Sequence, residues 1–281
     1  VNVGFDIVNV AHNHMLDSEG TEFLEHCNEF FTTRNVDVIG YYPNEESLEN
    51  IKVIEKNNIK IAFLSYTYGT NGFEVPSDSE VVVPFFDEEL VKKQVAIAKQ
   101  VADFIIVSSH WGYENTYSVN KTQRNYANLM NELGVDVVLG MHPHNIQPIE
   151  WKISPTGYKT LVVYSLGNYL SSMQRGMNLL GGMLELKIVR DCKTQEIYID
   201  SPLFIPTVTH CEQGDEFITK DDRGYRNYKI YYLSDYTEAL VNKHAVHGYE
   251  KNNESTLVGG KFSLETLYAT VNEYIDKEFL E

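Results

Sequence analysis

The sequence contains too few cysteines for a disulfide framework. Its 281 residues include three, Cys27, Cys192 and Cys211, an odd number with no close Cys-x-x-Cys spacing. Neither a disulfide scaffold nor a thiolate zinc site is therefore indicated. Cys27 lies among apolar residues at helical spacing, so we expect it in the core.

Long apolar runs are also lacking. No stretch of about 18 apolar residues occurs, and no charged segment followed by an apolar one opens the sequence, so neither a membrane-spanning helix nor a signal peptide is indicated within it. The first eight residues begin almost directly in an apolar, strand-like run without a methionine. We therefore expect an upstream segment to precede Val1.

Basic residues are scarce. There are 23 lysines and arginines against 40 acidic residues, which gives a net charge of -17. Long-range repulsion argues against binding to nucleic acid or to an anionic membrane surface. An anionic substrate would need a metal ion or a local group of cations. The cations nearest to the motifs below are Lys121, Arg124, Lys152 and Arg175, although solvated surface charge is the favoured interpretation of each.

The composition is that of an ordinary globular protein, with 43% hydrophobic residues. Apolar periodicity predicts an α/β fold in which helices alternate with short strands. The expected helices cover residues 21–34, 87–103 and 122–133, and two more helices close the chain. The expected strands cover residues 5–10, 36–39, 51–54, 59–64, 104–107, 135–139, 161–165, 183–189 and 197–205. A hairpin is predicted around Asn57 and Asn58.

Three of these strands end in side chains that can bind a metal ion. The run at residues 135–139 leads into His142 and His144, and the run at residues 5–10 leads into the segment at residues 11–17. The run at residues 104–107 leads into His110. Open α/β sheets hold ligands at the carboxyl ends of their strands, so these segments are candidates for one site. The loop at residues 65–83 either covers that site or is a solvated connection.

Histidine and asparagine together suit zinc, manganese or iron better than calcium, which prefers an all-oxygen shell. Such a set is typical of a catalytic site. A pair of divalent ions about 3.5–4 Å apart can bind both the attacking and the leaving oxygen of a phosphoryl group and lower the pKa of a bridging water. The same ions would supply positive charge that the acidic surface lacks.

The motifs resemble those of the bacterial poly-γ-glutamate capsule-synthesis proteins of the CapA or PgsA type. The resemblance covers residues 1–206, and the order and spacing of its segments match. Those segments are residues 5–17, 109–114, 140–150 and 164–169. This family is similar in turn to the calcineurin-like metallophosphoesterases, which implies a metallophosphatase-like four-layer α/β/β/α sandwich. It also implies a setting outside the cytoplasm, at the cell surface or the membrane.

The resemblance also implies roles for individual residues. Asn13, His110, His142 and His144 match metal ligands, and His14 matches the histidine that protonates a leaving group. Asp17 would orient His14, since histidines at such sites need a carboxylate partner. Glu114 is either a ligand or a supporting group. Asn168 is expected to position backbone or substrate rather than bind metal.

One part of the superfamily pattern is not found in this sequence. The acidic motifs that supply the first metal and the bridging carboxylate belong upstream of residue 11, and nothing precedes Val1 here. We therefore expect the fold to lack its N-terminal strands, and two ions of manganese, zinc or iron to bind only in the complete protein. His12 replaces a more usual asparagine, which we interpret as a harmless variant.

The expected domains are residues 1–210, carrying the phosphoesterase-like site, and residues 211–281, a helical extension packed on the core. Histidines outside the motifs are expected at the surface or in helix caps, namely His26, His210, His244 and His247.

Two functions remain open. One is a metal-dependent phosphoesterase-type hydrolase acting on a phosphoester or an anionic polymer. The other is a non-catalytic polymer-binding, export or anchoring component of a capsule assembly machine, with other membrane components as partners. A third possibility is that the histidines form a hydrogen-bonded cluster without metal. Nucleic acid is not an expected partner.

Overall fold

The computed structural model describes residues 4–17, 20–173, 175–214, 224–246 and 257–281. These residues form two compact units. Unit 1 contains residues 1–112, 120–142 and 151–162, and unit 2 contains residues 113–119, 143–150 and 163–281. The predicted division into residues 1–210 and 211–281 stays a prediction, and its boundary falls inside a strand, Ile197–Gln213.

A six-stranded sheet forms the centre of the fold, in the order β3-β4-β5-β6-β8-β7. Its strands are β3 (Lys52–Lys56), β4 (Ile59–Thr67), β5 (Phe104–His110), β6 (Val137–Met141), β7 (Ile146–Ile153) and β8 (Lys159–Leu166). Strands β4, β5 and β6 run parallel to one another, whereas β3 is antiparallel to β4. The expected α/β fold with a central sheet, which the metallophosphatase-like class implies, is confirmed.

The hairpin between β3 and β4 forms as predicted. Asn57 and Asn58 both have positive φ angles, 52° and 61°. Two consecutive residues of this kind are typical of the tight turn that matches the twist of antiparallel strands. Asparagine tolerates this conformation better than most residues do, which is why the sequence signal was clear.

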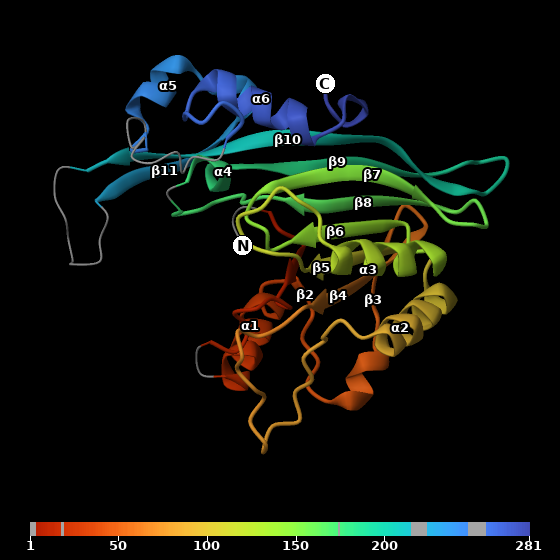
Figure 1. The fold of residues 1–281 in the computed structure, drawn as a ribbon. Coiled ribbons are helices and arrows are strands. Elements are labelled where there is room, and N and C mark those ends of the chain that lie inside the picture. The colour runs from red at the N-terminus through yellow and green to blue at the C-terminus, as the bar shows by residue number, and fades with distance from the viewer. Residues whose placement is uncertain (1–3, 18–19, 174, 215–223, 247–256) are drawn as a thin grey trace. The chain divides into compact units, whose positions relative to one another are not determined.

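The helices of unit 1 begin and end where local signals place them. They are α1 (Thr21–Thr32), the short η1 (Glu45–Glu49), α2 (Glu88–Val101) and α3 (Lys121–Glu132). The side chains of Asp87 and Asn120 accept hydrogen bonds from backbone N–H groups at the starts of α2 and α3. Figure 1 shows these two helices beside the strands of their unit.

Helix α1 departs from its expected packing. Leu24 is buried, but Phe23 and Phe30 are exposed. Cys27 is half-buried rather than a core residue. The Arg34 guanidinium lies 3.9 Å from the centre of the Phe30 ring, so a surface cation covers part of this apolar face.

The first strand, β1 (Ile7–Asn9), also differs from expectation. It pairs in parallel with β2 (Asp37–Ile39) in a separate two-stranded sheet. Its residues are half-buried, whereas a buried strand was predicted. A two-stranded sheet has no neighbouring strand on its outer sides, so other contacts must attach β1 to the rest of unit 1.

Unit 2 contains a three-stranded antiparallel sheet in the order β11-β10-β9, visible as neighbouring strands in Figure 1. The strands are β9 (Leu180–Arg190), β10 (Ile197–Gln213) and β11 (Tyr225–Tyr232). The helices of this unit are α4 (Gly176–Leu179), η2 (Leu233–Asp235), α5 (Glu238–Lys243), α6 (Leu264–Tyr274) and η3 (Lys277–Phe279). Strand β10 runs eight residues beyond the predicted end at Ile205, to Gln213.

Two histidines of unit 2 are buried rather than at the surface, although His244 is the C-cap residue of α5 (Glu238–Lys243), as a capping role predicts. His210 and His244 are each only 2% exposed. His247 lies outside the described residues. Among the residues that the structure describes, none of the helices has the length and apolar character that crossing a membrane requires.

Candidate functional site

Two histidines meet at the carboxyl edge of β5 and β6. His110 is the last residue of β5 and pairs with Met141, the last residue of β6, and His142 follows directly. The centres of the two imidazole rings are 4.7 Å apart, and both residues are buried. The parallel register therefore brings together two candidate metal ligands that lie 32 positions apart in the sequence.

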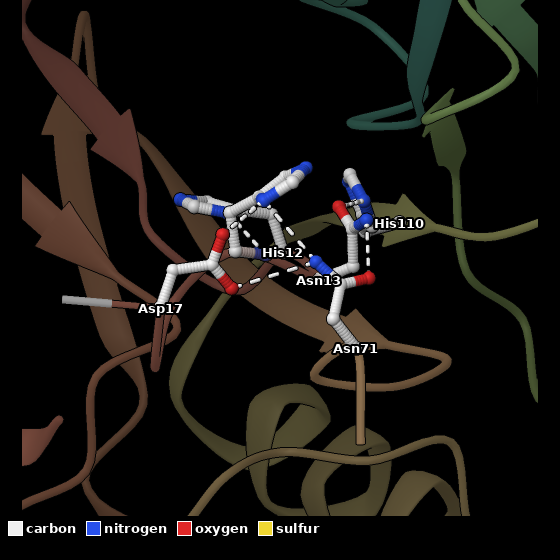
Figure 2. A network of polar contacts seen from close by, with 6 residues as sticks. His12, Asn13, Asp17, Asn71 and His110 are labelled. Atoms are coloured by element: carbon white, nitrogen blue, oxygen red, sulfur yellow. Dashed lines mark hydrogen bonds and ion pairs between the residues drawn. The ribbon is translucent and has the colours of Figure 1, made fainter. Parts of the chain in front are cut away.

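Asn13 joins these histidines from the loop after β1. Its side-chain oxygen, Oδ1, lies 2.9 Å from Nε2 of His110, and the residue is 3% exposed. Since the amide oxygen can only accept, Nε2 carries the proton of this hydrogen bond. Figure 2 shows this contact within a connected polar network. Three predicted ligands of unit 1 thus converge, namely Asn13, His110 and His142.

Asn9 attaches β1 to the central sheet. Its Nδ2 donates to Ser108 Oγ at 3.1 Å, on β5. Its Oδ1 accepts from Ser65 Oγ at 2.6 Å, on β4, and from the Ala11 backbone N–H at 2.9 Å. This side chain thereby fixes the start of the loop that carries Asn13. Sequence reasoning missed Asn9, although a polar residue within an apolar run was a usable signal.

His14 and Asp17 form the predicted pair at the surface of unit 1. Nδ1 of His14 lies within hydrogen-bonding distance of Asp17 Oδ2. Hydrogen bonding from His14 is the main cause that lowers the pKa of the Asp17 carboxyl below its ordinary value. The carboxylate is therefore ionised at neutral pH and can accept from Nδ1–H. Nε2 of His14 then accepts in the neutral ring and can donate outward only in the imidazolium. The His14 side chain is 57% exposed, so a substrate can reach it.

His12 supports the loop between β1 and α1. Its Nδ1 accepts from the backbone N–H of His14 at 3.1 Å, and its ring centre lies 6.0 Å from that of His110. Burial lowers the pKa of His12, and the neighbouring charge of His14 lowers it further. The residue therefore does more than the harmless variant that was predicted, because its side chain holds the backbone at His14.

Two residues of the segment after β4 contact the site, as expected for a loop that covers it. Tyr68 lies parallel to His110, with ring centres 6.0 Å apart, and 4.6 Å from the ring centre of His142. Asn71 accepts a hydrogen bond from Asn13 and donates one to Asp17, within the polar network that Figure 2 shows. Of the two aromatic residues that follow His110 closely in the sequence, Trp111 is buried, whereas Tyr113 is 69% exposed.

The backbone around the paired histidines adopts sparsely populated conformations. His142 has a φ angle of 97° and His144 one of 60°. Positive φ angles are uncommon for residues other than glycine and cost of order 1–3 kcal/mol each. Such strain is concentrated at functional sites, which is consistent with a role for both residues. The sequence contained no signal for these positive φ angles.

Within unit 2, His144 is held by a network of asparagines. Its Nδ1 lies 2.9 Å from Asn168 Oδ1, and Asn168 Nδ2 donates to the Asn178 carbonyl at 2.9 Å. The second bond fixes the Asn168 amide with its oxygen toward the imidazole. Nδ1 of His144 is therefore the protonated nitrogen, and Nε2 is the atom that can act as a ligand. Asn168 was expected to position backbone or substrate, and in the structure it contacts the His144 ring and the Asn178 carbonyl.

Asn178 was missed by sequence reasoning and holds the surrounding loops. Its Nδ2 donates to Asn115 Oδ1 at 2.9 Å, to Asn145 Oδ1 at 3.2 Å and to the His144 carbonyl at 3.3 Å. Glu114 is exposed, and its carboxylate lies within 4.8 Å of a ring nitrogen of His144. A carboxylate and an imidazole at this separation can both ligate one cation, so the metal roles of Glu114 and His144 stay predictions.

Comparisons with known proteins identify the family. The family described as "Bacterial capsule synthesis protein PGA_cap" matches residues 1–173. The chain is 32% identical over 170 residues to a Bacillus subtilis protein named "PGA biosynthesis protein CapA". It is 27% identical over 172 residues to the "Capsule biosynthesis protein CapA" of Bacillus anthracis. These alignments cover 60% and 59% of the chain, but 43% and 40% of the two relatives.

Solved structures that align with this chain include two nucleotidases. The NAD nucleotidase of Haemophilus influenzae aligns with a TM-score of 0.47 and 16% identity over 99% of this chain and 48% of that one. A 5'-nucleotidase precursor from Thermus thermophilus aligns with a TM-score of 0.39 and 20% identity over 63% of this chain and 35% of that one. At these TM-scores, neither alignment bears on function. The family match covers more than half of the chain and confirms the resemblance inferred from the motifs, so the protein belongs to the bacterial capsule synthesis family PGA_cap.

Proposed function

We propose that this chain acts in capsule biosynthesis and that Asn13, His110 and His142 hold a divalent metal ion in a phosphoesterase-type hydrolase site. The observation that carries the proposal is their convergence in unit 1. His110 Nε2 lies 2.9 Å from Asn13 Oδ1, and the His110 and His142 rings are 4.7 Å apart.

The donor set fits such an ion. Two imidazoles and one amide oxygen are borderline ligands that suit zinc, manganese or iron(II). All three residues are buried, so little water competes for the ligand atoms. A bound divalent ion would polarise a phosphoryl oxygen and lower the pKa of water.

His14 and Asp17 would transfer a proton beside this centre. The Asp17 carboxylate accepts from Nδ1–H of His14, so it stabilises the imidazolium and fixes its orientation. The exposed Nε2–H can then donate to a leaving oxygen. Tyr68, which lies against both buried histidines, would limit access of water.

The substrate class follows from the family and from charge. The names of the two relatives refer to PGA or capsule biosynthesis, which supports an anionic polymer or a phosphoester as substrate. A net charge of -17 repels such a substrate at long range, so a bound cation would be needed at the site. We further propose poly-γ-glutamate as the polymer, membrane components of a capsule assembly as partners and a location outside the cytoplasm.

The test combines metal content with turnover. Wild type, His110→Ala and His142→Ala would be loaded with manganese, zinc or iron(II) and analysed by elemental analysis and by metal titration. Turnover would be measured with bis(4-nitrophenyl) phosphate as diester and 4-nitrophenyl phosphate as monoester. We expect both variants to bind metal at least about 100-fold more weakly and to lose turnover in parallel.

A matched control is His26→Ala, since His26 is an exposed histidine on α1. It should keep both metal binding and turnover. Metal binding without turnover on either substrate would contradict the hydrolase proposal and favour a non-catalytic role in capsule assembly. Equal metal content in wild type and His142→Ala would contradict the proposed ligands.

A further inference from the structure

The loop that follows β4 brings one asparagine into the polar network of unit 1. Asn71 contacts the candidate ligand Asn13 on one side and the pair His14 and Asp17 on the other. Figure 2 labels Asn13, Asn71 and Asp17 of this network. Nothing in the apolar pattern of the sequence singles this residue out. Its local signal is the Asn-Gly dipeptide that it forms with Gly72, which is typical of a tight turn.

The orientation of the Asn13 amide decides whether this residue can serve as a ligand. Only the oxygen can bind a cation or accept from His110, whereas the NH₂ group can do neither. The two ends of an amide have the same shape, so packing alone does not distinguish them. Some neighbour must therefore hold the NH₂ group away from His110.

Asn71 is that neighbour. Nδ2 of Asn13 donates to Oδ1 of Asn71 at 2.9 Å, and Oδ1 of Asn13 consequently faces Nε2 of His110, also at 2.9 Å. If the Asn13 amide turned over, its NH₂ group would face Nε2–H, and its oxygen would face the oxygen of Asn71. Both contacts would then be repulsive.

The orientation of Asn71 is fixed in turn by Asp17. Nδ2 of Asn71 lies 3.5 Å from Oδ1 of Asp17. It also lies 3.1 Å from Nδ1 of His14, but this contact is not a hydrogen bond while that nitrogen donates to Asp17. A carboxylate only accepts, so the NH₂ group of Asn71 must be the end that faces Asp17. Since His14 Nδ1–H also donates to Asp17, the carboxylate receives two N–H donors. Asp17 thus orients both His14 and Asn71.

The turn that carries Asn71 is held independently of this network. Asn71 and Gly72 have φ angles of 55° and 82°. The Thr70 hydroxyl donates to the Phe73 carbonyl at 2.5 Å, and the Phe73 N–H donates to the Thr70 carbonyl at 2.9 Å. Thr70 is buried, whereas Asn71 is exposed. Removing the Asn71 side chain should therefore leave the fold intact.

We propose that Asn71 is a positioning residue: it fixes the amide of Asn13 with the oxygen toward His110 and couples that orientation to the His14–Asp17 pair. Its effect on metal affinity depends on the proposed metal site, but its effect on His110 does not. The protein therefore has a link between its candidate ligands and its candidate proton donor that runs through one loop side chain.

The experiment reads the tautomer of His110 in metal-free protein at pH 8, by ¹⁵N NMR of the histidine side chains. In Asn71→Gly the side chain is removed while the positive φ remains accessible. We expect the wild type to carry its proton on Nε2, and Asn71→Gly to shift His110 toward the Nδ1–H form because Asn13 can turn over.

The matched control is Asn57→Gly, at the left-handed position of the β3–β4 turn, which should leave the His110 signals unchanged. An unchanged His110 tautomer in Asn71→Gly would overturn the proposal. Manganese or zinc titration supplies a second readout, with affinity expected to fall about 10- to 100-fold in Asn71→Gly. If wild type binds no metal, the proposed function fails, while the tautomer measurement still decides the role of Asn71.

Discussion

At the scale of single residues, two candidate metal ligands are held by amide side chains rather than by charges. Asn71 orients Asn13, and Asn168 orients His144. An amide has a donor end and an acceptor end, so each one transmits a defined orientation to its neighbour. A carboxylate accepts at both oxygens, so it can orient a neighbouring amide, as Asp17 does for Asn71, but it presents no donor end of its own.

A different residue-scale feature lies at the amino ends of the strands. Asp136 accepts from the Ile105 backbone N–H at 2.7 Å and from the Tyr158 hydroxyl at 2.6 Å. Burial is the main cause that raises the pKa of this carboxyl to about 6, and the two hydrogen bonds act against it. The folded protein therefore binds a proton more tightly at Asp136 than the unfolded chain does.

This shift predicts a pH dependence of stability. Between about pH 4 and pH 6 the folded state holds the Asp136 proton that the unfolded chain has lost, so the free energy of unfolding falls as pH rises through this window. Across this window we expect the free energy of unfolding of Asp136→Asn to fall by about 1–2 kcal/mol less than that of the wild type. This range allows for the partial exposure of Asp136. The measurement is urea unfolding followed by tryptophan emission, since both tryptophans, Trp111 and Trp151, lie in unit 1.

The effect of Asp136 is the difference in the free energy of unfolding between wild type and variant at each pH, because other carboxylates titrate in the same range. The asparagine can accept from Ile105 with its oxygen and donate to the Tyr158 hydroxyl, so the site stays hydrogen-bonded. Identical pH slopes for the two proteins would show that Asp136 is not responsible.

At the scale of elements, the site depends on how β1 is attached. This short strand pairs only with β2 among the described strands, and the side chain of Asn9 bonds to β4 and β5. The residues that follow β1 include Asn13 and His14. The position of two candidate functional residues therefore rests on a buried hydrogen-bond network rather than on a sheet ladder.

Replacing Asn9 tests this attachment. We expect Asn9→Ala to lower the free energy of unfolding by about 1–3 kcal/mol, because the hydroxyls of Ser65 and Ser108 lose a partner. The variant should also weaken metal binding, since the loop that carries Asn13 becomes less ordered. Urea unfolding and metal titration measure the two effects.

Asn125→Ala, at an exposed position of α3, is the control, and should be neutral or slightly stabilising. A stability of Asn9→Ala equal to that of the wild type would mean that β1 is attached by other contacts.

At the scale of the whole molecule, unit 2 contains a buried titratable cluster apart from the candidate site. Nδ1 of His210 lies 2.7 Å from the Tyr236 hydroxyl, and its Nε2 lies 3.6 Å from Glu212. The His244 ring meets the His210 ring edge-on at 5.1 Å. Both nitrogens of His244 are in use, since Nε2 donates to the Thr209 carbonyl and Nδ1 accepts from Val246 N–H. These bonds join β10 to η2 and to the residues after α5.

Burial is the main cause that lowers the pKa of His210, and Lys229 and Lys243 lower it further, while Glu212 acts against them. The unfolded chain therefore binds a proton at this residue at a higher pH than the folded protein does. His210 therefore makes its full contribution to the free energy of unfolding above about pH 6.5. This contribution is lost as pH falls through the lowered folded-state pKa.

We therefore expect acidification from pH 7 to pH 5 to destabilise unit 2, and His210→Gln to reduce this loss. Because no tryptophan lies in unit 2, amide hydrogen exchange of β10 and β11 is the appropriate measurement. His26→Gln, at an exposed histidine of α1, should behave as wild type. An unchanged loss of protection in His210→Gln would contradict this assignment.

The sequence by itself determined the local elements and the residue types of the site. The turn at Asn57 and Asn58, the caps of α2 and α3 and the strands ending at His110 and His142 follow from short-range propensities, which neighbouring residues settle. The motifs also identified the family, because their order and spacing lie along the chain itself.

Only the tertiary structure decided which of these elements meet. The separate sheet of β1, the bonds of Asn9 and the position of Asn71 all involve partners that are distant in the sequence. The burial of His210 and His244 likewise depends on η2 and the residues after α5 packing on β10. A polar side chain has the same local signal whether it ends in solvent or in a buried network, so its partner is set by packing and not by its neighbours in sequence.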